Sequence, residues 1–271
     1  MKRSISTFST RFERRSSSNR PKTSSLAALI AAVTLAATIG APAPLPSASS
    51  QQLLDSGRFT LYVDGARVGE EEFLIREERG GAAGPVYQAS GAQRLKLEGR
   101  TMLVSVAIEA TGTRPRPRRY EAQVNGGSAT SVVARVIADR LRLEIRSPSG
   151  EHMKEFLVRG RTAILDRYIA HHYFFVGRLL GDETGTAIEA VAPRTQQKMR
   201  YRVEDRGSER IRIGDREFTT RHLMLSPDSG EPRHVWLDGD RVIRVTVPDE
   251  GFIAERSDEV DSSPSSSRGT S

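Results

Sequence analysis

Five histidines are the side chains best suited to acid–base or metal chemistry in this sequence. They are His152, His171, His172, His222 and His234. On a helix, His171 and His172 would project about 100° apart, so the two rings could not easily share a metal ion. No H-x-x-x-H or H-E-x-x-H spacing is present. The sequence therefore predicts no metal site.

Motifs for nucleophilic catalysis and for cofactor binding are absent from the sequence. The chain has no cysteine and no G-x-S-x-G elbow, so neither a thiol nor an activated serine nucleophile is indicated. No G-x-x-x-x-G-K-S/T or G-x-G-x-x-G motif follows a strand, so no cofactor is expected. We assign no catalytic residue, and an enzymatic role is the less favoured interpretation.

Two groups of residues could still supply acid–base chemistry. The run Glu70, Glu71 and Glu72 looks like a cluster, but alternate residues of a strand face opposite sides. Only Glu70 and Glu72 would share a face, and we interpret the run as a solvated edge. His172 would lie on an apolar helical face. We favour a satisfied core histidine there, and the alternative is a base paired with a carboxylate of a facing strand.

One helix is expected to position His172. In residues 163–180, AILDRYIAHHYFFVGRLL, the apolar residues recur along one helical face. They are Ile164, Leu165, Tyr168, Ile169, Phe175, Val176, Leu179 and Leu180. Asp166 is suited to be the N-cap and Gly181 to end the helix. The pattern predicts one amphipathic helix over about residues 165–180.

Most other segments alternate between apolar and charged residues. Leu141, Leu143 and Ile145, for example, are separated by arginine and glutamate, and DG pairs at 64–65 and 238–239 are strong hairpin signals. Such alternation is typical of an antiparallel sheet with one solvated face, whose apolar face must be covered. We predict a mainly β fold: a single antiparallel curved sheet, or an open or half barrel, with the helix packed on the concave face.

A loose fit between the helix and the sheet would leave an apolar cavity. We predict that this cavity is lined by Tyr168, Ile169, His172, Phe175, Val176 and Trp236. The partners expected there are an apolar small molecule or lipid, or a protein of the cell envelope.

The N-terminal region accounts for most of the formal net charge of +7. Residues 1–25 hold seven basic residues and one acidic residue, so the remainder is nearly neutral and no nucleic-acid partner is expected. Residues 26–40 are apolar, about 15 residues against the ~20 that span a bilayer, and small residues follow. We predict a signal peptide at 1–48, export to the periplasm or outside the cell, and no integral membrane protein after cleavage.

The part of the chain after the predicted signal peptide divides into three segments by amino-acid composition. Residues 49–56 are expected to form a leader and residues 57–256 a single β domain. Residues 257–271 are polar and serine-rich, and we expect a disordered tail there because such a composition cannot bury a core.

Three stretches resemble a group of uncharacterised exported bacterial β proteins, which are known only as domains of unknown function. They are FTLYVDGARVG (Phe59–Gly69), LDRYIAHHY (Leu165–Tyr173) and VWLDGDRVIRV (Val235–Val245). The resemblance covers roughly residues 57–256. It implies an envelope or secreted protein with a curved sheet, and it implies no activity.

Three interpretations of function stay open from the sequence. The first, which we favour, is a non-enzymatic envelope protein that binds an apolar ligand or a protein partner in the concavity between sheet and helix. The second is a structural envelope protein. The third is a hydrolase with a histidine–carboxylate site near the helix, assembled from Asp166 and His171 or His172.

Overall fold

The computed structural model describes residues 50–79, 84–126, 129–181, 183 and 185–257 of the chain. All of them lie in one compact unit. The predicted signal peptide (1–48) and all but the first residue of the predicted tail (257–271) lie outside the described residues.

The described residues are mostly in strands. The strands are β1 (Ser50–Val63), β2 (Ala66–Arg79), β3 (Val86–Leu97), β4 (Arg100–Thr111), β5 (Arg116–Asn125), β6 (Thr130–Ile137), β7 (Arg140–Ser147), β8 (Gly150–Leu157), β9 (Thr162–Ile164), β10 (Thr186–Ala192), β11 (Gln197–Ile213), β12 (Arg216–Pro227), β13 (Arg233–Asp238), β14 (Arg241–Val247) and β15 (Phe252–Arg256). The helical segments are the 3-10 turns η1 (His171–Tyr173) and η2 (Pro248–Glu250) and the α-helix α1 (Phe174–Leu180).

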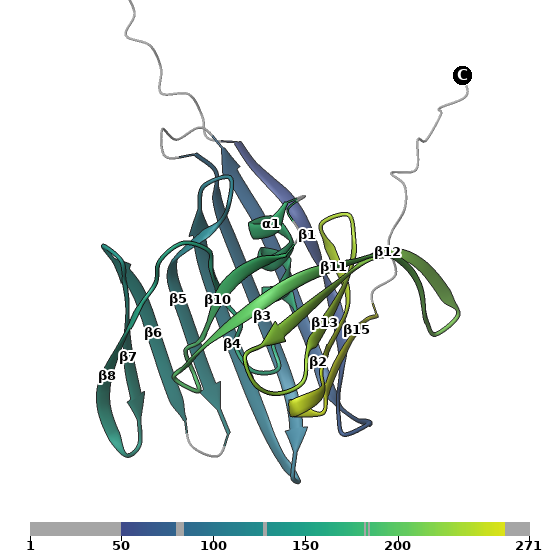
Figure 1. The fold of residues 1–271 in the computed structure, drawn as a ribbon. Coiled ribbons are helices and arrows are strands. Elements are labelled where there is room, and N and C mark those ends of the chain that lie inside the picture. Colours follow the sequence, from purple (N-terminus) through teal and green to yellow (C-terminus); the bar gives the residue numbers. More distant parts are fainter. Residues whose placement is uncertain (1–49, 80–83, 127–128, 182, 184, 258–271) are drawn as a thin grey trace, which may run out of the picture. The chain divides into compact units, whose positions relative to one another are not determined.

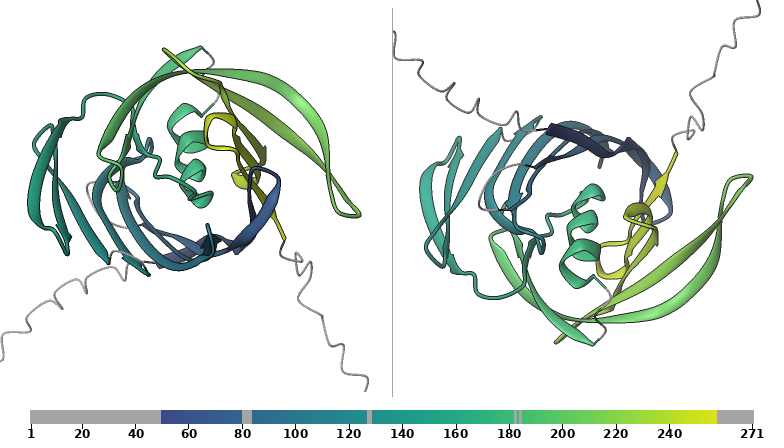
Figure 2. Two further views of the ribbon diagram at one scale, coloured as in Figure 1. Left: turned by 90° about the horizontal axis from the view of Figure 1, so that it is seen from below. Right: turned by 90° about the horizontal axis from the view of Figure 1, so that it is seen from above.

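These strands form one sheet in the order β8-β7-β6-β5-β4-β3-β2-β1-β15-β14-β13-β12-β11-β10-β9. Neighbouring strands are antiparallel, except for the parallel pair of β9 and β10. Because β8 and β9 end the sheet, it is open (Figure 1). It curls around α1, which lies inside the curve (Figure 2). The predicted fold class, an open antiparallel β sheet with one helix on its concave face, is confirmed.

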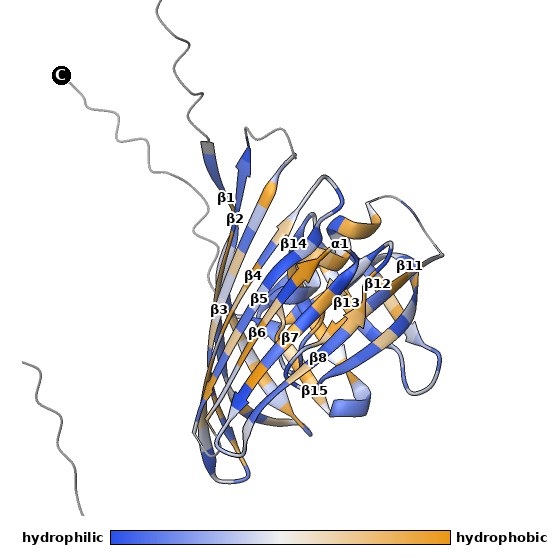
Figure 3. Cartoon of the chain, turned by 90° about the vertical axis from the view of Figure 1, so that its left-hand side faces the viewer, coloured by the Kyte–Doolittle hydropathy of each residue, from blue (hydrophilic) through white to orange (hydrophobic). Residues whose placement is uncertain are grey.

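The core lies on the concave face, where alternate residues of each strand point inward. Figure 3 shows apolar and polar residues alternating along the strands. In β7, for example, Leu141, Leu143 and Ile145 are buried against exposed or half-exposed neighbours. Five of the seven residues of α1 are buried in the same core. In the described part of the chain, no helix is both long and apolar enough to cross a bilayer.

The helix is shorter than the sequence predicts. It begins at His171 with η1, continues as α1 and ends at the expected Gly181, whose N–H donates to the Gly177 carbonyl at 3.0 Å. Residues 162–164 are instead a fully buried strand, β9. A short buried apolar run of this kind cannot be told from a helical face by its pattern alone. Tyr168 has a φ of 62°, which a right-handed helix cannot accommodate. The predicted start at about residue 165 is therefore wrong.

The predicted leader at 49–56 also differs from the structure. The first strand, β1, begins at Ser50 and pairs with β2 along nearly its whole length. Asp55 within it is only 6% exposed and binds Arg256 of β15. Polar residues such as Gln51 and Gln52 are exposed, which gives the segment the composition of a linker.

Candidate functional site

A buried carboxylate holds the start of the helix. The side chain of Glu71, on the inward face of β2, is fully buried. It accepts hydrogen bonds from the backbone N–H groups of Ala170 (2.9 Å) and His171 (3.0 Å), from His171 Nδ1 (2.5 Å) and from Gln93 Nε2 (2.8 Å). The first N–H groups of a helix have no partner within it. Glu71 therefore caps the helix from a neighbouring strand, in the role that Asp166 was predicted to have.

The charge of Glu71 is stabilised despite its burial. Burial raises the pKa of this carboxyl group, but His171 lowers it through charge and through the ring hydrogen bond. The backbone N–H groups of Ala170 and His171 lower the pKa further, so that it lies below its ordinary value. Glu71 is accordingly ionised at neutral pH and accepts all four bonds.

The prediction of a solvated edge is right for two of the three glutamates and wrong for Glu71. Glu70 and Glu72 are on the outer face, where both pair with Arg58. Glu71 has the same parity along β2 as the buried Phe73 and Ile75. That alternation was the signal in the sequence that could have identified Glu71 as an inward-facing residue.

A glycine makes room for the His171 ring. A Cβ atom at Gly91 of β3 would lie 2.5 Å from His171 Cε1 and 2.9 Å from His171 Nδ1. The ring also stacks parallel to Phe73, with 5.8 Å between the ring centroids. The absence of a side chain at Gly91 thus leaves room for the ring that binds the Glu71 carboxylate.

A second carboxylate, Asp166, joins the loop before the helix to the sheet. Its fully buried side chain accepts hydrogen bonds from the Tyr120 hydroxyl and from Arg194 Nε, the latter at 2.9 Å. Burial raises the pKa of Tyr120 well above its ordinary value, and the Asp166 carboxylate raises it further. Tyr120 therefore stays protonated and donates. The N–H of Asp166 donates to His172 Nδ1 at 3.2 Å.

His172 is a neutral core histidine. Burial lowers the pKa of its imidazole well below the ordinary value, and the charges of His171 and Arg194 lower it further. Its ring is edge-on to Tyr120, with 6.0 Å between the centroids. The favoured interpretation from the sequence agrees with this environment.

We expect His172 to make the stability of the protein depend on pH. In the unfolded chain its pKa returns to about 6.5, so below that pH the unfolded state binds a proton that the folded state does not. The free energy of unfolding should therefore be fully retained above about pH 6.5 and fall by up to about 1.4 kcal/mol per pH unit below it.

Urea denaturation at a series of pH values measures this dependence. His172→Asn keeps a side-chain acceptor for the Asp166 N–H and should flatten the slope between about pH 5 and 6.5. His152→Asn, at an exposed position of β8, should leave the slope unchanged. An unaltered slope in His172→Asn would show that His172 is not the titrating group.

The two inner histidines do not form a site open to a substrate. His171, His172 and Glu71 have no exposed side-chain surface, and Asp166 is 2% exposed. A general base must come within hydrogen-bond reach of the proton it removes. The inner histidine–carboxylate pair instead supports the helix.

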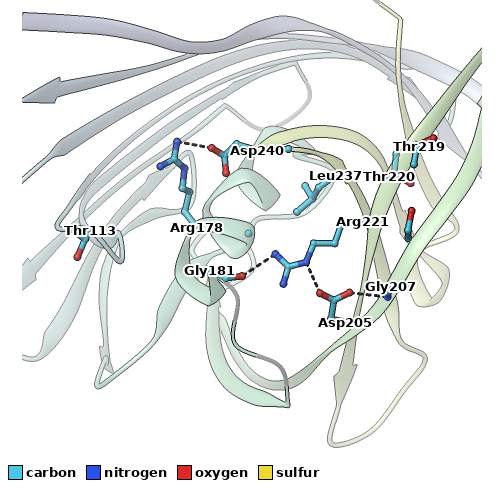
Figure 4. A pocket seen from close by; sticks show the side chains of 13 residues that line it. Thr113, Arg178, Gly181, Asp205, Gly207, Thr219, Thr220, Arg221, Leu237 and Asp240 are labelled. Carbon is cyan, nitrogen blue, oxygen red and sulfur yellow. Dashed lines mark hydrogen bonds and ion pairs between the residues drawn. The ribbon is translucent and has the colours of Figure 1, made fainter.

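An open cleft lies at the C-terminal end of the helix (Figure 4). Its volume is about 760 Å³, and it lies between α1 and the strands β11, β12 and the β13–β14 turn. It is lined by Thr113, Gly177, Arg178, Gly181, Asp205, Gly207, Ser208, Thr219, Thr220, Arg221, Leu237, Gly239 and Asp240. The lining is rich in hydroxyl groups and in glycines that expose the backbone.

Two ion pairs shape the cleft. Arg178 Nη2 lies 2.7 Å from Asp240 Oδ2, and Arg221 Nε donates to Asp205 Oδ2 at 2.6 Å. Arg221 Nη1 also donates to the carbonyl of Gly181 at 2.9 Å, which satisfies one carbonyl at the end of the helix. Each arginine is balanced by one aspartate, so the cleft is polar without a strong net charge.

The predicted cavity residues lie in three places, and none of the six lines this cleft. Ile169, His172, Phe175 and Val176 are packed in the core, at most 3% exposed. Tyr168 is half-buried and contacts Phe252, with 5.3 Å between the ring centroids. Trp236 is on the outer face of β13, because its neighbours Val235 and Leu237 point inward.

Comparisons with known proteins find a similarity of fold and none of sequence. No known protein family matches the chain, and no curated protein matches it. The fold is similar to the crystal structure of a β-barrel-like protein of domain of unknown function DUF1849 from Brucella abortus. The TM-score is 0.40 at 8% sequence identity, over 76% of this chain and 96% of that chain.

Proposed function

We propose that this chain is an exported, non-enzymatic binding protein that holds a ligand in the cleft between the helix and the sheet. The observation that carries the proposal is the cleft itself. Its volume of about 760 Å³ lies within the range of about 300–1,000 Å³ that is usual for ligand sites. The cleft lies between the helix and the sheet, although none of the six residues predicted from the sequence to line a cavity there contributes to it.

The lining favours an amphipathic ligand over a purely apolar one. Thr219 and Ser208 offer hydroxyl groups, while Leu237 and Gly177 offer apolar surface. The two arginine–aspartate pairs leave little net charge to attract a strongly charged molecule. A neutral or zwitterionic ligand with several hydroxyl or amide groups and an apolar part fits this lining.

The inner carboxylates and histidines support the non-enzymatic interpretation. Their hydrogen bonds cap the helix and hold the loop before it. The cleft residues lie on different elements and include no histidine.

The proposal of export depends on the basic, apolar and small-residue pattern of residues 1–48. Measuring the mass of the mature chain purified from its natural compartment tests it. A mature N-terminus close to Ser49 is the expected result.

We expect a substitution that fills the cleft to abolish ligand retention. Thr219 is an exposed cleft residue of β12, and Thr219→Trp would place an indole in the space. Native mass spectrometry of the protein purified from its own compartment should show an extra mass that disappears on denaturation. That mass should be lost in Thr219→Trp.

The control is Thr101→Trp, at an exposed position of β4 that does not line the cleft. It should retain the extra mass, because tryptophan is well tolerated on an exposed strand face. A bare chain mass for the wild-type protein, or equal retention in both variants, would contradict binding in this cleft.

A further inference from the structure

A second pocket, which shares no lining residue with the cleft, lies on the concave side of the sheet. Its volume is about 240 Å³, and it is formed by β10, β11, the start of β13, the turn η2 and the loop that follows β9. We call it the arginine pocket, after two of its lining residues, Arg167 and Arg233. Four of its other lining side chains are apolar: Leu165, Ala190, Ala192 and Met199.

Arg233 is an arginine at an inward-facing position. It has the same parity along β13 as the buried Val235 and Leu237, and its side chain is only 12% exposed. Its Nη1 donates to the Tyr173 hydroxyl at 3.0 Å, and its Nη2 donates to Glu250 Oε1 at 3.2 Å. A guanidinium has more N–H donors than these two bonds use. Arg233 can therefore bind a further acceptor that enters the pocket.

The charges around the arginine pocket do not cancel. Glu250 Oε2 lies 3.5 Å from Arg167 Nε, so this one carboxylate serves both arginines. None of the other described residues that line the pocket is charged. Arg194, which lies close by, is balanced by its own partner Asp166. One positive charge is left over in a partly buried space, where an anion is stabilised more strongly than in water.

The Tyr201 hydroxyl is a second donor in the wall of this pocket. It donates to the sulfur of Met199, another lining residue, at 3.4 Å, and a thioether is a weak acceptor. Burial raises the pKa of Tyr201 to about 12, so the hydroxyl keeps its proton at neutral pH. A carboxylate oxygen would be a better acceptor for this proton.

We infer that the arginine pocket binds a small monocarboxylate, with the carboxylate held by Arg233 and Tyr201 and an apolar tail against Leu165, Ala190 and Met199. A planar guanidinium matches the geometry of a carboxylate, and a single negative charge balances the single excess positive charge. A water molecule takes up ~30 Å³ in the liquid, so a pocket of about 240 Å³ accommodates about eight non-hydrogen atoms. Hexanoate has this size. The inference does not depend on the proposed function, because the cleft is a separate site.

Isothermal titration calorimetry of the full chain with hexanoate tests the inference. We expect saturable binding of one hexanoate per chain at pH 7. Hexanamide has the same shape without the charge and should bind about 10–100-fold more weakly, because hydrogen bonds to a charged group are the stronger ones. Inorganic phosphate has no apolar part and should not displace hexanoate. Equal affinities for hexanoate and hexanamide, or displacement by phosphate at equal concentration, would contradict a carboxylate site.

Three substitutions assign the binding to this pocket. Arg233→Met should abolish hexanoate binding, and Tyr201→Phe, which removes only a hydroxyl group, should weaken it about tenfold. Glu250→Gln removes the competing carboxylate and should tighten binding, an effect that a merely structural role of these residues would not produce. Circular dichroism confirms that each variant is folded.

Two controls leave the arginine pocket intact. Arg210→Met changes an arginine whose side chain is 78% exposed and should bind hexanoate as the wild type does. Thr219→Trp fills the cleft and should also leave hexanoate binding unchanged, which separates this site from the proposed function. No saturable binding of hexanoate, or binding that survives both Arg233→Met and Tyr201→Phe, overturns the inference.

Discussion

Replacing Glu71 by alanine should destabilise the protein by about 3–5 kcal/mol, as expected when one partner of a buried charge pair is removed. The carboxylate is fully buried and accepts four hydrogen bonds, two of them from the first N–H groups of the helical segment. Without it, these N–H groups, His171 Nδ1 and Gln93 Nε2 lose their shared acceptor in a space that water does not reach. Urea denaturation followed by circular dichroism measures the change.

The matched control for Glu71→Ala is Glu72→Ala, one residue further along β2. Glu72 points outward, its side chain is 64% exposed, and it pairs with Arg58 on the surface. Exposed ion pairs contribute about 0–1 kcal/mol, so the free energy of unfolding should change by no more than that. Similar losses for the two variants would mean that the inward carboxylate has no special role.

Replacing Arg256 by alanine should have a comparable effect, again about 3–5 kcal/mol. Its guanidinium donates to both oxygens of Asp55, at 3.0 and 2.8 Å, and to the carbonyl of Ser56 at 2.7 Å. The two side chains of the pair are 2% and 4% exposed. This bidentate pair joins β1 to β15, so it links the two halves of the sheet at the point where the first and last strands meet.

A double substitution distinguishes the stabilisation that the Arg256–Asp55 pair provides from the penalty of leaving one of the two charges buried without the other. Arg256→Met alone leaves Asp55 buried, with Arg241 Nε 3.9 Å away as its remaining cation. Arg256→Met combined with Asp55→Leu removes both charges and should recover most of the lost stability, since well-packed apolar residues often replace a buried pair without loss. Thermal denaturation of the two single variants and the double variant gives the coupling energy. A strictly additive result would contradict a direct interaction.

The sheet was predictable because its strands are buried on one face only. The alternation of Leu141, Leu143 and Ile145 with charged residues states directly which side chains point inward. Alternate residues of a strand face opposite sides of the sheet. Because Val235 and Leu237 point inward, Trp236 lies on the outer face. Because Phe73 and Ile75 point inward, Glu71 does so as well. At Trp236 and Glu71 the residue type and the parity along the strand point to opposite faces, and parity decides the direction of the side chain.

The helix start and the cleft were not predictable in the same way. Residues 162–166 are all buried, so their apolar pattern does not distinguish a strand or loop from a helix. The polar cleft brings together Thr113, Arg178 and Asp240, which are far apart in the sequence and lie at the ends of different elements. The hydrogen bond between the His222 and His234 rings likewise depends on the register of β12 and β13, which no spacing motif reports.

We expect the buried network around Glu71 to fix the helix inside the sheet and to leave the cleft open at the far end of the helix. Hydrogen–deuterium exchange on wild type, Glu71→Gln and Glu72→Gln tests it directly, because exchange reports local opening. Glu71→Gln should speed exchange across residues 169–180 while the strands β4 to β7 stay protected, and Glu72→Gln should match the wild type. Unchanged protection of residues 169–180 in Glu71→Gln would contradict the claim.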